Sequence, residues 1–473
     1  MKPSIPQGTR DFSPEEVRKR QYIFNTLRAI FEVYGFQPLE TPSMENLTTL
    51  TGKYGEEGDR LIFKILNNGL HEKKDADKEK LNVEWNKILS KPYSSPVVTE
   101  RALRYDLTIP FARYVVMHQN ELAFPFRRYQ MQPVWRADRP QKGRYREFWQ
   151  CDVDMVGSTS LINEAELLCI YEEAFVKLNI PFLIQVNSRK ILLGLAEQCG
   201  QKDKYVDLAV ALDKLDKIGV VGVKQELRSK DFNEDSVKKL FELLGEGGPM
   251  IYAEGKINRL KEIMKGSEVG MAGIEEVEQI LKYYTSLSKF NGEYPESLKG
   301  SAITISDTLA RGLNYYTGMI VEVVAQGVSI GSIGGGGRYD DLTGLFGLKG
   351  VSGVGVSFGV DRIYDVMEEL DRFPKQLSEG TKVLLINSGG DNEIYALEVL
   401  QQLRAEGIAA EIYPDAVKID KQYKYATKRG ITTLLITEDE ERLNEKVKLK
   451  SFSNSTHMSI PECIAVLKET NKI

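Results

Sequence analysis

A short turn between two strand-like runs carries four arginines, and this density suits the binding of an anion. The arginines are Arg136, Arg139, Arg144 and Arg146. Guanidinium groups this close repel one another unless solvent or an anion separates them, and their planar forks fit phosphate in a bidentate manner. On charge alone, a solvated basic hairpin explains the cluster at least as well.

The residues that follow this turn favour a binding site. Gln150, Asp152 and Asp154 occupy alternate positions of the next strand-like run, so their side chains share one face of a sheet. An arginine-rich turn therefore opens onto a strand that presents one amide and two carboxylates. This combination favours a ligand with a phosphate at one end and an amine or an imidazole at the other.

A second turn combines an arginine with aromatic side chains. Arg311 stands beside Gly312, where the backbone can approach a ligand closely, and Tyr315 and Tyr316 follow. Taken alone, this segment is explained better by packing tyrosines and a surface arginine than by a site.

Two glycine-rich segments, 334–341 and 353–362, could contact a nucleotide. Neither contains the GK[ST] of a Walker A loop, and Phe358 stands where a Rossmann fingerprint needs its third glycine, so both motifs are rejected. A glycine-lined strand that lets a flat base lie against the backbone remains, with Arg362 at the start of the next helix. Glycines required only by tight turns are the alternative.

The chain as a whole is acidic and of ordinary composition. It has 473 residues, 42% hydrophobic and 28% charged, and a net charge of −5, which excludes a uniformly basic nucleic-acid-binding protein. No apolar run approaches the ~20 residues of a membrane span, and the N-terminus lacks the apolar core of a secretory signal. Four scattered cysteines and three histidines argue against a zinc site or a disulfide framework, and a reducing cytoplasm fits best.

Periodicity predicts the elements that must position these residues. Ser13, Pro14 and Glu16 form a capping pattern that opens a helix, and residues 36–42 contain prolines that favour an edge or interface strand. Short β-rich runs from 97 to 187, interrupted by one helix over 163–178, predict an antiparallel sheet. A β-α-β-α-β pattern after residue 380 predicts a small α/β domain with a largely parallel sheet.

Together these segments resemble the class II aminoacyl-tRNA synthetases, and within them the histidyl-tRNA synthetase family. Residues 34–42 resemble motif 1, the helix-strand dimerisation element, residues 126–154 resemble motif 2, and residues 353–362 resemble motif 3. Residues 311–317 resemble the signature peculiar to the family. Each class II motif is degenerate on its own, but all three in order together with this signature are highly specific.

The resemblance covers nearly the whole chain and implies its fold and activity. The fold would be α+β, and the activity would be ATP-dependent ligation of L-histidine to its cognate tRNA through a histidyl-adenylate, with Mg²⁺ accompanying ATP, in a cytoplasmic homodimer. The expected parts are a catalytic core over 1–200 with a surface insertion at 70–92, a helical insertion over 201–295, the continued core over 296–370, a linker over 371–380 and an anticodon-binding domain over 381–473.

The resemblance also implies a role for each site residue. Arg136 and Arg311 would hold the α-phosphate of ATP and contact histidine. The other expected roles are contacts to the histidine ammonium (Asp106, Thr108, Gln150), to the imidazole and its pocket (Asp154, Tyr315, Tyr316), to adenine (Asp138, Phe148) and to the outer phosphates with Mg²⁺ (Arg144, Arg362).

A basic helix face in the last hundred residues completes the expected sites. Lys421, Lys424 and Lys428 lie at i, i+3 and i+7 of a predicted helix, so they share one face. In an acidic chain this stripe favours contact with phosphates, and we expect it to bind the anticodon region of tRNA. The same spacing is equally consistent with a helix face that is only exposed to solvent.

A second functional reading keeps the fold but not the catalysis. A non-catalytic histidine-binding subunit that regulates a histidine-pathway phosphoribosyltransferase would retain the amino-acid pocket. It would not need the ATP-binding arginines or the C-terminal domain. Because Arg136, Arg311, Arg362 and the domain after residue 380 are all present, the sequence favours the ligase.

Overall fold

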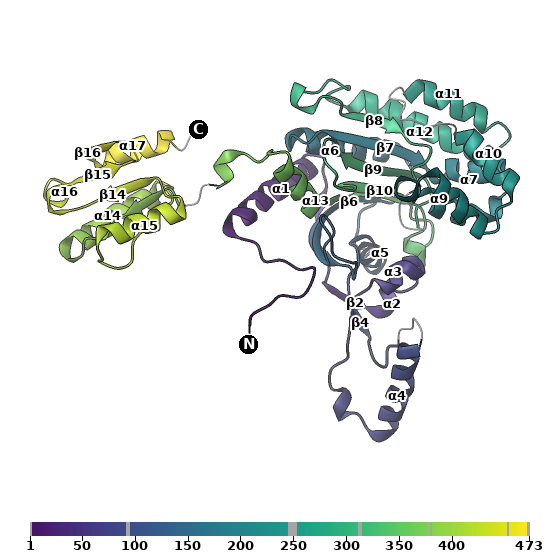
Figure 1. The fold of residues 1–473 in the computed structure, drawn as a ribbon, viewed down its shortest axis with the longest axis horizontal. Coiled ribbons are helices and arrows are strands. Elements are labelled where there is room, and N and C mark those ends of the chain that lie inside the picture. The colour runs from purple at the N-terminus through teal and green to yellow at the C-terminus, as the bar shows by residue number, and fades with distance from the viewer. Residues whose placement is uncertain are drawn as a thin grey trace. The chain divides into compact units, whose positions relative to one another are not determined.

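The computed structural model describes residues 2–90, 95–244, 253–310, 315–378, 381–451 and 454–470. Contacts within the chain divide it into two compact units. The larger unit contains Met1–Asp11 and Arg20–Arg372, and the smaller unit contains Phe12–Lys19 and Phe373–Ile473. Figure 1 shows that each unit is built around its own sheet.

An eight-stranded sheet within the described ranges forms the centre of the larger unit, in the order β1-β5-β6-β11-β10-β9-β7-β8. Neighbouring strands are antiparallel except at the two edges, where β1 is parallel to β5 and β8 is parallel to β7. The predicted antiparallel sheet is therefore confirmed, with the segment 36–42 supplying an edge strand. The strands are β1 (Gln37–Pro38), β5 (Phe126–Trp135), β6 (Glu147–Val156), β7 (Phe182–Ser188), β8 (Ala302–Ile305), β9 (Met319–Ala325), β10 (Gly334–Tyr339) and β11 (Gly353–Gly359).

The β5–β6 hairpin is longer and more continuous than the sequence predicted. In place of the short β-rich runs expected in this region, residues 126–135 form one strand, and Pro133 lies inside it opposite Trp149. A proline is tolerated here because β1 pairs only with Arg128 and Tyr129, so β5 is an edge strand at Pro133. The hairpin therefore carries the arginine turn at its tip.

Three helices cover one face of this sheet. They are α1 (Pro14–Val33), α6 (Ile162–Lys177) and α13 (Val360–Glu369), drawn on the same side in Figure 1. Phe358 of β11 lies between two of them, with its ring centroid 5.7 Å from that of Phe31 and 4.6 Å from that of Tyr171. Because side chains alternate along a strand, the neighbouring Ser357 points to the opposite face of the sheet. That opposite face is free to carry a site.

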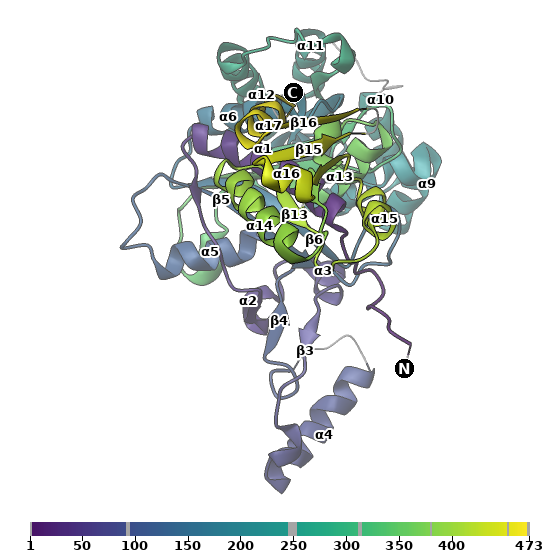
Figure 2. The same cartoon turned by 90° about the vertical axis from the view of Figure 1, so that its left-hand side faces the viewer.

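A small three-stranded sheet and three helices flank that opposite face. The strands β2 (Met44–Asn46), β4 (Arg101–Leu103) and β3 (Lys64–Ile65) pair in this order, beside α2 (Leu47–Leu50), α3 (Gly55–Arg60) and α5 (Thr108–Met117). The predicted insertion 70–92 contains α4 (Asp75–Ser90), which has no buried residue and extends away from the sheets in Figures 1 and 2.

Helices also occupy most of the segment between β7 and β8. Gly194 and Gly270 lie where two of these helices touch, because a Cβ on Gly194 would come within 2.7 Å of the Gly270 backbone. Among the described residues, no helix is both long and apolar enough to cross a membrane. The helices are α7 (Arg189–Gln198), α8 (Tyr205–Leu212), α9 (Leu215–Ser229), α10 (Glu234–Leu244), α11 (Ala253–Ile263) and α12 (Glu268–Leu287).

The smaller unit has a five-stranded sheet in the order β13-β12-β14-β15-β16. The first three strands are parallel, as the βα alternation predicted, but two antiparallel strands that the sequence analysis missed extend the sheet. The strand β15 was not recognised in the sequence because lysines at every second position interrupt its apolar residues. The elements are β12 (Val383–Leu385), α14 (Gly390–Ala405), β13 (Ala410–Ile412), α15 (Ile419–Arg429), β14 (Thr433–Ile436), α16 (Asp439–Leu443), β15 (Lys446–Lys450), β16 (Ser455–Ser459) and α17 (Ile460–Thr470).

Candidate active site

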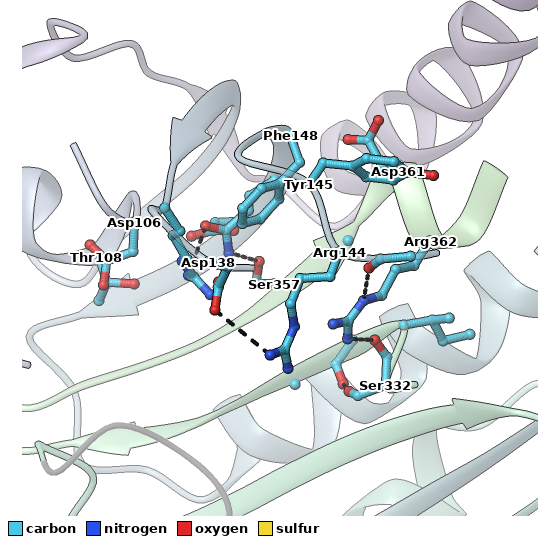
Figure 3. A pocket seen from close by; sticks show the side chains of 18 of the residues that line it. Asp106, Thr108, Asp138, Arg144, Tyr145, Phe148, Ser332, Ser357, Asp361 and Arg362 are labelled. Atoms are coloured by element: carbon cyan, nitrogen blue, oxygen red, sulfur yellow. Dashed lines mark hydrogen bonds and ion pairs between the residues drawn. The ribbon is translucent and has the colours of Figure 1, made fainter. Parts of the chain in front are cut away.

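A pocket of about 280 Å³ opens on the uncovered face of the large sheet. Its walls come from the β5–β6 hairpin, the start of α5, the strands β10 and β11 and the start of α13. Figure 3 shows Asp106 and Thr108 toward one side and Arg144 and Arg362 toward the other. The lining residues that the sequence analysis selected are Asp106, Thr108, Arg136, Asp138, Arg144, Phe148, Gln150, Tyr315, Tyr316 and Arg362.

Among the described residues, Asp154 and the three selected lysines do not line this pocket. Asp154 is buried behind the lining, and Arg311 lies outside the described residues. The three lysines are on α15 of the smaller unit, where Lys421, Lys424 and Lys428 are all exposed.

Asp106 provides a buried carboxylate at one side of the pocket. Its Oδ1 accepts hydrogen bonds from the Ile109 amide at 3.1 Å and the Tyr54 hydroxyl at 3.0 Å. Its Oδ2 is buried and has no hydrogen-bond partner among the described residues. Burial raises the pKa of Asp106, and the two hydrogen bonds and Arg136 oppose this rise. The open oxygen is suited to receive a cationic donor such as an ammonium group.

Arg136 lines the pocket with its guanidinium near the rings of Tyr105 and Phe148. Its Nε donates to the Tyr105 carbonyl at 3.0 Å, and its Nη2 is 3.5 Å from the Gln150 Oε1. The guanidinium carbon is 4.3 Å from the centroid of the Tyr105 ring and 5.2 Å from that of Phe148. Two aromatic rings and one backbone bond therefore hold the guanidinium in place, which is the preorganisation that binding of a developing anion requires.

The opposite side of the pocket contains two more arginines and the base of the hairpin turn. Arg362 donates through Nε to the Gly143 carbonyl at 2.7 Å and through Nη1 to the Ser332 carbonyl at 2.6 Å. Arg144 lies 3.7 Å from Asp138. The Arg362 bonds tie the turn to the start of α13 and to the segment before β10. Positive charge is thus concentrated where a polyphosphate could lie.

The floor of the pocket is made by glycines, as the glycine-rich segments suggested. A Cβ on Gly334, which lines the pocket, would lie 2.7 Å from the Tyr171 ring. Gly355 does not line the pocket, but a Cβ on it would lie 2.0 Å from the Asp154 Oδ1 behind the lining. Only glycine fits at these two positions without displacing a neighbour. Gly334 and Gly335 line the pocket, so a flat ligand can lie directly against the backbone of β10.

Sequence reasoning missed several residues that shape the site. Asp361 accepts from the Trp149 amide at 2.7 Å and pairs with Arg20 at 2.6 Å and with Arg10, which joins the start of β6 to the start of α13. Ser357 accepts from the Gln150 Nε2 at 2.7 Å. Each partner comes from a distant segment. The only local signal for Asp361 was its position beside Arg362.

Two known protein families match the two parts of the chain. The family described as Histidyl-tRNA synthetase matches residues 99–363, and an Anticodon binding domain matches residues 382–470. The chain is 54% identical to a Histidine--tRNA ligase of Christiangramia forsetii over 97% of both chains. It is 50% identical to one of Phocaeicola vulgatus over 99% of both.

Solved structures show the same fold. The crystal structure of histidyl-tRNA synthetase from Nostoc sp. PCC 7120 has a TM-score of 0.78 at 28% identity, covering 99% of this chain and 100% of that one. A Bacillus halodurans protein titled as an ATP phosphoribosyltransferase regulatory subunit/histidyl-tRNA synthetase has a TM-score of 0.67 at 19% identity, which is a likeness of fold alone.

The antiparallel sheet, the arginine hairpin and the glycine-floored pocket define a class II aminoacyl-tRNA synthetase with a C-terminal anticodon-binding domain. Within that class, the chain belongs to the histidyl-tRNA synthetase family. Its activity is the ligation of histidine to tRNA with ATP as a substrate, and the regulatory-subunit reading is not favoured.

Proposed function

We propose that the pocket described above forms histidyl-adenylate, with the amino acid beside Asp106 and ATP beside Arg144 and Arg362. The observation that carries this proposal is the pocket itself, which joins a buried carboxylate with an open oxygen to a cluster of arginines. The histidine carboxylate and the α-phosphate would then meet at Arg136, which lies between the two sides.

The chemistry of this step explains why arginines dominate the site. A carboxylate attacks the α-phosphorus, and the new acyl-phosphate bond forms as the bond to pyrophosphate breaks. Nucleophile and leaving group are both already ionised, so the step needs no general acid or base. It needs positive charge where negative charge builds up, together with positioning of the two substrates. Arg136, assisted by Arg311, would supply that charge.

The remaining roles are those that the family resemblance implies, and most of these residues line the pocket. Asp106, Thr108 and Gln150 would bind the ammonium group, and Tyr315 and Tyr316 would enclose the imidazole with Asp154 behind them. Phe148 would stack on adenine, beside Asp138, and Arg144 and Arg362 would contact the outer phosphates.

Mg²⁺ would enter as a complex with ATP. Two carboxylates line the ATP side, and both have cationic partners: Asp361 pairs with Arg20, and Asp138 lies near Arg144. Mg²⁺ commonly relies on substrate phosphates and water with few protein ligands. The phosphate oxygens would therefore be its main ligands here.

The histidine KM should depend on pH through Asp106. Burial raises the pKa of Asp106 above the ordinary value for aspartate, and protonation removes the charge that attracts the ammonium group. We expect the KM to rise as the pH is lowered through this raised pKa and to level off above it. The Asp106→Asn variant should show a higher KM with a flatter profile, measured by histidine-dependent ATP–pyrophosphate exchange.

The substrate imidazole also titrates, with an unperturbed pKa of about 6.5. The useful quantity is therefore the difference between the pH profiles of the histidine KM for the wild type and for Asp106→Asn, because the titration of the substrate contributes equally to both. Parallel profiles for the wild type and Asp106→Asn would contradict the assignment.

We also propose that the protein acts as a homodimer through the segment 34–42 and the adjoining end of α1. Val33, near the end of α1, is 76% exposed although it is aliphatic, and the following β1 is an edge strand. An exposed strand edge beside an exposed apolar side chain is a surface that a second copy of the chain can bury.

The exposed lysines of α15 would bind the anticodon region of tRNA. Replacing Lys421, Lys424 and Lys428 together by glutamate should weaken tRNA binding and reduce the slope of log affinity against log salt by about 3, one for each lost phosphate contact. Histidine-dependent ATP–pyrophosphate exchange should not change. Filter binding of tRNA at several salt concentrations measures both quantities.

The matched control reverses the charge of three lysines on α4. Lys78, Lys80 and Lys87 are also exposed, so their replacement by glutamate gives the same change in net charge at a different surface. Equal losses in the two triple variants would reject a specific role for α15 in tRNA binding.

The residue roles can be tested with a hydrolysis-resistant histidyl-adenylate analogue bound in a crystal. The proposal expects the analogue ammonium within hydrogen-bond distance of Asp106 and the phosphate replacement within hydrogen-bond distance of Arg136. An analogue bound with these two groups exchanged, or outside the pocket, would overturn the assignments.

A further inference from the structure

The N-terminal segment 7–10 packs against the hairpin turn that carries the pocket arginines. The Gly8 carbonyl accepts a hydrogen bond from the Arg146 amide at 2.9 Å. Gly8 has a φ of +86°, and a Cβ on it would lie 2.8 Å from the Arg146 side chain, so glycine is what permits this close approach. The segment is therefore held against the residues that lead into β6.

Arg10, at the end of this segment, contacts two residues that line the pocket. Its guanidinium carbon lies 3.3 Å from the centroid of the Tyr145 ring in the hairpin turn. The same guanidinium forms an ion pair with Asp361 at the start of α13. A planar guanidinium can stack on an aromatic ring and pair with a carboxylate at the same time. One side chain thus joins the turn to the helix.

Both contacts are adjacent in sequence to an arginine of the ATP side. Tyr145 follows Arg144 in the turn. Asp361 precedes Arg362, and these four side chains are labelled in Figure 3. The like charges of Arg144 and Arg362 oppose their approach to each other before a ligand binds. A brace between their neighbours would keep the two arginines at one spacing, and such preorganisation reduces the free-energy cost of binding.

The charge of Asp361 alone does not require Arg10. Arg20 also pairs with this carboxylate, at 2.6 Å, and is buried. The Arg10 side chain is 25% exposed. One arginine is enough to balance one carboxylate, so the second arginine at Asp361 points to a further task. The task that its contacts indicate is to hold Tyr145.

We propose that Arg10 is a positioning residue for ATP. It holds the turn and the start of α13 so that Arg144 and Arg362 keep the spacing that binding of the outer phosphates requires. This inference rests on the proposed placement of ATP beside these two arginines. Arg10 is not among the residues that line the pocket, so it acts through its neighbours.

The first test is the variant Arg10→Gln in histidine-dependent ATP–pyrophosphate exchange. The KM for ATP should rise by roughly 10-fold, less than the ~10² that a misplacement of about 1 Å can cost. The kcat should change less than this KM, because a contact made equally in the ground state and the transition state affects KM alone. The KM for histidine should stay nearly constant, since the expected ammonium contacts lie at the Asp106 side of the pocket.

Two further variants separate positioning from a general effect on stability. Arg10→Lys keeps the charge beside Asp361 but loses the planar group that stacks on Tyr145, so the KM for ATP should rise by a smaller factor than in Arg10→Gln. In Tyr145→Leu the ring is already absent. Adding Arg10→Gln to it should therefore raise the KM for ATP by a smaller factor than in the wild type, and equal factors in the two backgrounds would contradict the inferred coupling.

Lys2→Gln is the matched control, because it removes the same charge from the same N-terminal stretch. Lys2 is exposed, so its replacement should leave the KM for ATP within about twofold of the wild type. A KM for ATP in Arg10→Gln no higher than in Lys2→Gln would overturn the inference. Equal rises in the KM for ATP and for histidine would assign Arg10 to the stability of the whole pocket and would also overturn it.

A measurement on the wild type makes the test independent of how the variants fold. The Thr9 amide donates to the Pro6 carbonyl at 3.2 Å within the N-terminal segment. If this segment positions the ATP side, reciprocity requires that ATP stabilise the segment, so hydrogen exchange at Thr9 should slow when ATP binds. Unchanged exchange would reject the inference. Failure of the proposed function is distinguishable, because the wild type would then show no histidine-dependent ATP–pyrophosphate exchange.

Discussion

Replacement of Arg136 by glutamine is expected to lower the rate of histidine activation by about 10²–10³, the usual cost of removing one preorganised donor from a developing charge. The guanidinium is held by the Tyr105 carbonyl and by two aromatic rings, between the side of the pocket suited to the ammonium and the side suited to the phosphates. Glutamine keeps polarity but loses the charge. The kcat of ATP–pyrophosphate exchange measures the effect.

Arg139→Gln is the control for this prediction. Arg139 belongs to the same turn and is exposed, and it does not line the pocket. Its replacement removes an equal charge from the turn and should leave the exchange rate within about twofold of the wild type, as a screened surface charge does. If the exchange rate fell by a similar factor in Arg136→Gln and Arg139→Gln, the total positive charge of the turn, rather than contact by Arg136, would stabilise the reaction.

Replacement of Arg128 by methionine is expected to destabilise the larger unit by about 3–5 kcal/mol, because it leaves a buried charge without its partner. Arg128 is fully buried, its Nη2 is 2.9 Å from the Asp154 Oδ2, and its guanidinium lies 4.3 Å from the centroid of the Phe111 ring. Thermal unfolding followed by circular dichroism should show a lower melting temperature.

The pH dependence of this loss has a defined sign. Burial already raises the pKa of Asp154, and Arg128 is the main group that lowers it. Without Arg128 the folded protein favours the protonated carboxyl more strongly, so the stability of the variant falls as the pH rises through that pKa. The loss should therefore be smaller in acid. Adding Asp154→Asn to Arg128→Met should recover part of the stability, and a double variant no more stable than the single one would contradict the pairing.

The sequence allowed many of the residues that line the pocket to be selected, but not their contacts. The arginine turn, the alternate polar residues of β6 and the glycine-rich strands could be recognised because each depends on local spacing. The edge position of β1 followed from its prolines in the same way. These predictions needed only the two-residue period of strands and the absence of side chains on glycines.

The difference between Asp152 and Asp154 could not be predicted. Both residues lie on one face of one strand, and period alone makes them equivalent. Arg128 from β5 forms an ion pair with Asp154 and Tyr339 from β10 donates a hydrogen bond to it, whereas no described residue forms an ion pair or a hydrogen bond with the Asp152 Oδ1. Only the pairing of strands far apart in the sequence brings these partners together.

The most direct test is ATP–pyrophosphate exchange with each of the twenty amino acids in turn. The pocket described here should support exchange with histidine and give only background with the other nineteen, since a site that hydrogen-bonds a substrate group rejects analogues without it by about 10⁴ or more. Exchange with another amino acid at a comparable rate, or no exchange with histidine, would contradict the account.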